Sequence, residues 1–98
     1  MAEGLRLTYK LELSRQAMEF GERLPAKQQR QIAERLERLK QTPNDPPSEQ
    51  LQGFAPYRRL KAGEFRIIYT VEAETVFVRL IGKRNDDEIY KALQRAMR

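Results

Sequence analysis

The chain has 98 residues, 40% of them hydrophobic, which suffices for one domain with a single modest core but not for two. It contains neither cysteine nor histidine, so disulfides, thiolate nucleophiles and the commonest transition-metal ligands are excluded. Nineteen Lys and Arg residues against fourteen Asp and Glu give a net charge of +5, which favours an acidic partner such as nucleic acid or an acidic protein.

The chain shows no sign of membrane insertion or secretion. No apolar run approaches the roughly 20 residues that cross a bilayer, and the amino terminus lacks the apolar core of a signal peptide. We therefore expect a cytoplasmic protein that does not bind membranes.

The N-terminal half combines one strand pattern with two helical patterns. Apolar residues alternate over residues 5–13, which predicts a strand, and Ser14 is a suitable N-cap for the helix that follows. Residues 15–24 and 26–41 carry apolar side chains at helical spacing on either side of Pro25, so we expect an αα-hairpin. The predicted buried stripes are Ala17, Phe20 and Leu24, then Ile32, Leu36 and Leu39.

A proline-rich connection leads to a predicted β-hairpin. Residues 43–56 hold four of the five prolines and predict an irregular segment. The hairpin spans residues 57–69, and Gly63 can adopt the positive φ that its turn requires. Alternation along the strands places Arg59 and Lys61 on one face, where Arg66 of the second strand can join them. Such a group of cations repels itself unless an anion binds, and phosphate is the obvious candidate.

The C-terminal part predicts a further strand and a helix. Residues 75–81 are β-branched and aromatic, and Gly82 ends the strand. Acidic residues open the next segment, where the helix dipole favours anions, and residues 86–97 carry a helical apolar stripe. The stripe consists of Ile89, Leu93, Ala96 and Met97.

The order of elements predicts an α+β fold in one domain over residues 1–98. It comprises an N-terminal strand, the αα-hairpin, a three-stranded antiparallel meander and a C-terminal helix. We expect the helices on one face of the sheet and a basic, uncovered face on the other. An exposed basic face of this kind predicts a binding surface.

The order of elements and two segments resemble the RelE/ParE superfamily of bacterial toxin–antitoxin toxins. The segments are RLKAGEFRIIY, residues 59–69, and GKRNDDEIY, residues 82–90, and the likeness covers nearly the whole chain. RelE-type toxins are similar in carrying a Gly-Lys-Arg or Gly-His-Arg turn after the last strand and a tyrosine six residues beyond the arginine. Arg84 and Tyr90 hold these positions here. The resemblance implies a single RelE-like toxin domain with the sandwich fold of microbial RNases.

The resemblance to the RelE branch implies a ribosome-dependent mRNA endoribonuclease that inhibits translation. Such an enzyme cleaves the codon in the ribosomal A site by attack of the RNA 2′-OH, without a metal or other cofactor. The catalytic residues that the resemblance implies are Arg59, Lys61, Arg66, Arg84 and Tyr90. We also expect Arg58, Lys83 and Arg79 to contact RNA or the ribosome. For Arg58 and Arg79, however, exposed strand positions favour a solvated side chain or pairing with Glu72 or Glu74 over a catalytic role.

These residues suggest separate tasks. Arg66 and Arg84 suit the stabilisation of charge on the phosphorane, since a guanidinium binds two phosphate oxygens. Arg59 stands where RelE active sites look to have a lysine, so Lys61 is the candidate general base, its pKa lowered by neighbouring arginines. A site that has no base of its own and relies on ribosomal RNA stays open. Tyr90 either stacks on a codon base or helps proton transfer.

Two other functions remain open, and both keep the same fold. ParE-type relatives look like the same scaffold used to inhibit DNA gyrase without nuclease activity. A non-catalytic RNA-binding domain would bind RNA with a strong salt dependence. The resemblance also implies a cognate antitoxin, acidic and partly disordered, that wraps the helices and the basic face and displaces or covers the last helix.

Overall fold

The computed structural model describes residues 8–44, 48–85 and 88–96. Within them the chain forms five strands and three helices, and the expected α+β fold is confirmed. In chain order the elements are β1 (Lys10–Leu13), α1 (Arg15–Glu22), α2 (Ala26–Leu39), β2 (Ser48–Gln50), β3 (Arg58–Ala62), β4 (Phe65–Glu72), β5 (Thr75–Lys83) and α3 (Glu88–Ala96).

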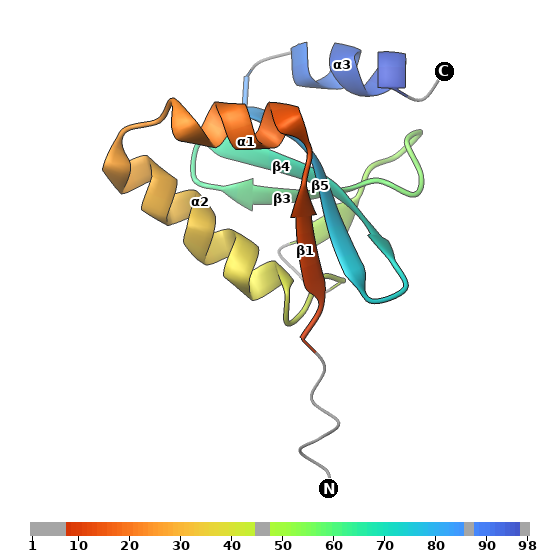
Figure 1. The fold of residues 1–98 in the computed structure, drawn as a ribbon. Coiled ribbons are helices and arrows are strands. Elements are labelled where there is room, and N and C mark those ends of the chain that lie inside the picture. Colours follow the sequence, from red (N-terminus) through yellow and green to blue (C-terminus); the bar gives the residue numbers. More distant parts are fainter. Residues whose placement is uncertain (1–7, 45–47, 86–87, 97–98) are drawn as a thin grey trace, which may run out of the picture.

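The strands form a single sheet in the order β1-β5-β4-β3-β2. The predicted meander is present, because β3, β4 and β5 pair antiparallel in succession. It gains an edge strand on each side, since β1 pairs parallel with β5 and β2 pairs antiparallel with β3. Strand β2 lies inside the segment that was expected to be irregular. Figure 1 shows the α1–α2 hairpin, orange to yellow, beside this sheet and α3, blue, near the end of β5.

The αα-hairpin covers one face of the sheet. Ser14 caps α1, as expected, with its Oγ accepting the N–H of Ala17 at 3.1 Å. The apolar stripes of α1 and α2 then pack on the strands, and the predicted buried residues of α2 are all buried. Their partners in this core are Leu60, Ala62, Phe65, Ile67, Tyr69, Val76, Val78 and Ile81. Burial of these side chains provides the main stabilisation of the fold.

The second face of the sheet is not uncovered, which corrects the sequence-based expectation. Ile68 and Leu80 are cross-strand partners on this face, and both are buried. Helix α3 packs on them through Ile89 and Leu93, and Leu51 joins the same cluster. The physical reason is that a sheet face carrying large apolar side chains needs its own cover. Lys61, on the basic part of this face, stays exposed.

A β-bulge lies in β5 and decides which face its last residues occupy. Tyr69 pairs with Val78 and Ile68 pairs with Leu80, so Arg79 has no partner in the register. Leu80 and Gly82 therefore share the face that α3 covers. An added Cβ at Gly82 would lie 3.2 Å from Cδ1 of Ile89, so the glycine permits the close approach of α3.

Several predicted boundaries differ from the structure. β5 continues beyond Gly82 to Lys83, and α2 ends at Leu39. α3 begins at Glu88, and the expected acidic first turn and Met97 lie largely outside the described residues, as do residues 5–7 of the first strand. None of the helices within the described residues is long and apolar enough to cross a membrane.

Candidate nucleic-acid interface

The hairpin presents a cationic face made of Arg59, Lys61 and Arg66. Lys61 pairs directly with Arg66 across β3 and β4, and Arg59 lies two positions along the same face of β3. This is the arrangement that the sequence predicts. The guanidinium of Arg66 donates from Nη1 to the carbonyls of Gly63, at 2.9 Å, and Phe65, at 2.8 Å. Lys61 is exposed, and its ammonium makes no hydrogen bond to the described residues.

Arg59 connects the cationic face to α3. Its Nη1 donates a hydrogen bond of 2.9 Å to the Tyr90 hydroxyl, and its Nη2 donates to Glu49. Its Nε is covered and has no hydrogen-bond partner among the described residues. The hydrogen bonds to Glu49 and Tyr90 raise the pKa of Arg59, so this side chain acts as a fixed cation.

Glu49 is the site residue that the sequence analysis missed. It lies on β2 directly opposite Arg59, and its exposed carboxylate forms an ion pair with that guanidinium. The hydrogen bond and the charge of Arg59 lower the pKa of Glu49, and the charges of Lys61 and Arg66 lower it further. The three residues of β2 carry no apolar alternation and follow two prolines, so no local signal indicated a strand there.

Tyr90 belongs to α3 and lies at the edge of the apolar cluster that α3 forms with Ile68 and Leu80. Its ring is half-buried and packs against Phe54, with ring centroids 6.5 Å apart and planes at 48°. The hydroxyl faces Arg59, as the hydrogen bond requires. Within the described residues, the predicted tyrosine and one predicted cation are therefore brought into direct contact.

Arg84 and Lys83 lie at the end of the sheet where β5 finishes. Both side chains are exposed. The backbone N–H of Arg84 donates to the carbonyl of Glu64 at 2.7 Å, which holds the Gly-Lys-Arg segment against the β3–β4 turn. Because Gly82 pairs with Arg66, this segment begins beside the cationic face. No hydrogen bond joins the Arg84 side chain to another described residue.

Arg58 and Arg79 have other surroundings. Arg58 Nε donates to Ser48 Oγ at 2.9 Å, and its Nη2 lies 3.3 Å from the carbonyls of Asn44 and Ser48. Its guanidinium thus supports the segment before β3, and its partners are not Glu72 or Glu74. Arg79 is exposed, and its carbonyl accepts a hydrogen bond of 2.6 Å from Ser14 Oγ. Neither side chain belongs to the cationic face.

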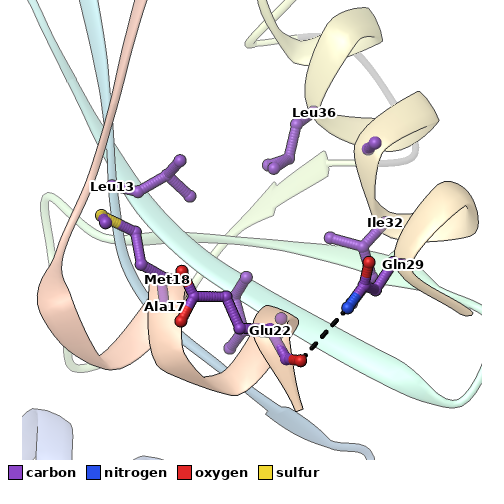
Figure 2. A pocket seen from close by; sticks show the side chains of 10 residues that line it. Leu13, Ala17, Met18, Glu22, Gln29, Ile32 and Leu36 are labelled. Atoms are coloured by element: carbon purple, nitrogen blue, oxygen red, sulfur yellow. Dashed lines mark hydrogen bonds between the residues drawn. The ribbon is translucent and has the colours of Figure 1, made fainter. Parts of the chain in front are cut away.

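An apolar groove runs between α1 and α2. Its volume is about 280 Å³, and Leu13, Ala17, Ile32 and Leu36 line it. Figure 2 shows these side chains between the two helices, with Gln29 donating to the carbonyl of Glu22 at 3.2 Å. Met18 also lines the groove and is 50% exposed, the one large hydrophobic side chain so exposed among the described residues. This α1–α2 groove is a second candidate binding surface.

The described residues contain no cluster of three or more acidic, cysteine or histidine side chains that could hold a metal ion. The side chains that the structure gathers at the cationic face are arginines, a lysine, a tyrosine and one glutamate. Guanidinium groups bind phosphate through paired hydrogen bonds, so the cationic face fits an RNA or DNA backbone.

The fold and the cationic face together define a small α+β domain with an αα-hairpin on one side of a five-stranded sheet and a short helix on the other. The family model described as the ParE toxin of the type II toxin–antitoxin system parDE matches residues 11–88. The chain therefore belongs to the ParE toxin family, within the RelE/ParE superfamily, and is a toxin of a type II toxin–antitoxin system. No curated protein matches it in sequence.

Several solved structures that resemble this one are of RelE toxins. A free double arginine-to-alanine mutant of Escherichia coli RelE is 21% identical, with a TM-score of 0.78 over 94% of this chain and 100% of the other. The toxin of the RelE–RelB complex from Pyrococcus horikoshii is 21% identical, with a TM-score of 0.70 over 81% and 98%. A chain of the intact E. coli RelBE toxin–antitoxin complex is 23% identical, with a TM-score of 0.67 over 80% of this chain and 99% of the other. The chain thus has the fold of RelE toxins.

Proposed function

We propose that the protein is a ribosome-dependent mRNA endoribonuclease that inhibits translation by cutting the codon in the A site. The observation that carries this proposal is the contact between Arg59 and Tyr90, which links a cationic face to an aromatic side chain. Cations bind the phosphate, and an aromatic ring binds a base by stacking. A surface that only had to attract an acidic partner would need the charges without the tyrosine.

The proposed reaction is a metal-free transesterification. The 2′-oxygen loses its proton and attacks the adjacent phosphorus, and the bond from phosphorus to the 5′-oxygen breaks. The 5′-oxygen takes up a proton, so the products are a cyclic phosphate and a 5′-OH. Arg66 and Arg84 neutralise the charge that develops on the phosphorane, and Arg59 orients the phosphate. The bonds from Arg66 to two backbone carbonyls fix its guanidinium before substrate binds, which avoids reorganisation during the reaction.

The proton of the 2′-OH needs an acceptor. Lys61 lies on the cationic face without a hydrogen-bond partner for its ammonium among the described residues, and in its neutral form it accepts a proton. The ionised carboxylate of Glu49 is a second group on this face. If neither side chain is required for cleavage, the acceptor comes from ribosomal RNA.

A purified translation system tests this proposal. A defined message is translated with and without the protein, and new 5′ ends are mapped by primer extension. We expect cleavage within the A-site codon that requires the ribosome and is lost in Arg84→Ala, and the Lys61→Ala variant shows whether that lysine is the base. Arg30→Ala, an exposed arginine of α2, is the matched control. Intact message with normal translation contradicts the proposal.

A second candidate function is inhibition of DNA gyrase. The match to the ParE toxin family favours it. Gyrase inhibition needs a binding surface and no catalytic residues. A gyrase supercoiling assay distinguishes the two functions. Inhibition of supercoiling by the parent protein and by Arg84→Ala, with no cleavage of mRNA, would establish it.

A cognate antitoxin is the expected partner, since two of the structurally similar toxins were solved with RelB antitoxins. The α1–α2 groove fits an apolar helical segment of such a protein, which would cover Met18. The cationic face would attract its acidic residues. Met18→Glu should weaken antitoxin binding, measured by isothermal titration calorimetry, while Met18→Leu should preserve it.

A further inference from the structure

On one edge of the Arg59 guanidinium, only one of the two N–H donors has a hydrogen-bond partner among the described residues. The Nε–H and Nη2–H groups of an arginine lie on the same edge and together bind two oxygens of a carboxylate or phosphate. Here Nη2 donates to Glu49, while Nε is covered and unpartnered among the described residues. Covered donors without a partner are rare in folded proteins, and each needs an explanation. A ligand that supplies two oxygens would satisfy this edge.

The carboxylate of Glu49 lies where such a ligand would be attracted. Its side chain is 49% exposed, compared with 26% for that of Arg59. The charges of Arg59, Lys61 and Arg66 all act on it, so it lies within reach of the whole cationic face. An RNA phosphate drawn to these cations therefore competes with Glu49 for Arg59.

Glu49 can leave this position at little cost to the fold. β2 is a three-residue edge strand whose one partner among the described strands is β3. The exposed side chain can rotate without breaking backbone hydrogen bonds. Exposed ion pairs contribute little to stability. Arg59 would keep its orientation, because Nη1 remains bonded to Tyr90.

We propose that Glu49 stands in for an RNA phosphate on Arg59 in the free protein, and that a phosphodiester displaces it to bind Nε and Nη2 together. This inference rests on the proposed RNA substrate and requires no cleavage. Glu49 is then an internal competitor that weakens RNA binding. Its removal should tighten the complex.

Fluorescence anisotropy with a labelled, single-stranded, 2′-O-methyl RNA oligonucleotide measures this directly, since the methylated probe cannot be cleaved. We expect Glu49→Gln to lower Kd about two- to fivefold, the range for breaking an exposed ion pair. Glu12→Gln is the matched control, because Glu12 is an exposed residue of the opposite edge strand, β1. Unchanged or weaker binding by Glu49→Gln overturns the proposal, as does an equal gain in both variants.

A double-mutant cycle assigns the effect to Arg59. In an Arg59→Gln background the Glu49→Gln substitution should change Kd by less than about twofold, because the site of competition is gone. A gain that persists in this background means that Glu49 repels RNA without occupying Arg59, which also overturns the proposal. Circular dichroism melts of each variant establish that it is folded under the assay conditions.

The cleavage assay separates this inference from the proposed function. If Glu49→Gln binds RNA more tightly and the parent protein cuts no message, the displacement stands and the nuclease proposal fails. If Glu49→Gln loses cleavage while Kd for the methylated probe is unchanged, Glu49 takes part in the reaction and the displacement is overturned.

Discussion

Nη1 of Arg59 donates a hydrogen bond of 2.9 Å to the hydroxyl of Tyr90, so strand β3 and helix α3 are joined by a polar contact on the second face of the sheet. The two residues come from different segments of the chain, and the cover of this face brings them together. A change at either residue should therefore affect both the docking of α3 and the cationic face.

Replacing Tyr90 with phenylalanine should lower the free energy of unfolding by about 1–2 kcal/mol, because one hydrogen bond from a charged donor is lost while the ring remains. Urea denaturation measures the change. Tyr57→Phe is the control: its ring belongs to the same apolar cluster, and its hydroxyl has no hydrogen bond to the described residues. Equal losses in the two variants would show that the contact with Arg59 contributes nothing.

The rate of A-site cleavage by Arg66 variants should fall in the order of how much of the guanidinium's charge and shape each variant keeps. If the protein is a nuclease, Arg66→Ala should reduce the rate of A-site cleavage by about 10²–10³, the usual effect of removing one charge-stabilising donor. Arg66→Lys should lie between this variant and the parent, because it keeps the charge and loses the planar fork. Arg30→Lys should cut normally. An Arg66→Ala enzyme with full activity would remove this residue from the mechanism.

The ion pair of Glu49 with Arg59 predicts a dependence of stability on pH. The hydrogen bond and charge of Arg59 lower the pKa of Glu49 in the folded state, so the stabilisation is present above the ordinary glutamate pKa. It is lost as the pH falls through the lowered value. The difference in free energy of unfolding between the parent and Glu49→Gln should thus shrink from about pH 6 to pH 3. In an Arg59→Ala background the difference should vary much less with pH, because only the charges of Lys61 and Arg66 then lower the pKa of Glu49.

Two glycines should respond to alanine in opposite directions. Gly82→Ala places a methyl group 3.2 Å from Cδ1 and 3.3 Å from Cβ of Ile89, and the overpacking should cost about 1–3 kcal/mol. Gly21→Ala meets nothing within 4 Å and should stabilise α1 by about 0.5–1 kcal/mol. Thermal melts of the pair measure both effects. A stabilised Gly82→Ala variant would mean that α3 does not pack closely on β5.

The local patterns of the sequence predicted most of the framework. The cap at Ser14, the stripes of α1 and α2, and the alternation that puts Arg59, Lys61 and Arg66 on one face all follow from periodicity. The convergence of the cations needed only this alternation. These features depend on residues close together in the sequence, so the sequence alone was enough to predict them.

The parts that were missed depend on distant contacts. β2 becomes a strand because β3 offers it an edge, and nothing in Ser48–Gln50 itself indicates that pairing. The cover of the second face by α3 required knowledge that Ile68 and Leu80 meet there. Glu49 was overlooked for the same reason, because its role depends on the strand that carries it.

The bulge at Arg79 has a consequence for insertions and deletions in β5. A strand's side chains alternate between faces, so one additional residue reverses the assignment of everything that follows. Val76 and Val78 point toward the αα-hairpin. After the unpaired Arg79, Leu80 points toward α3 and Ile81 again points toward the αα-hairpin. Arg79 is thus the extra residue that shifts the alternation of side chains in β5 by one position. Its deletion would close the bulge and leave Leu80 and Gly82 on the face that α3 covers, whereas one residue inserted between them would turn Gly82 toward the αα-hairpin and away from Ile89.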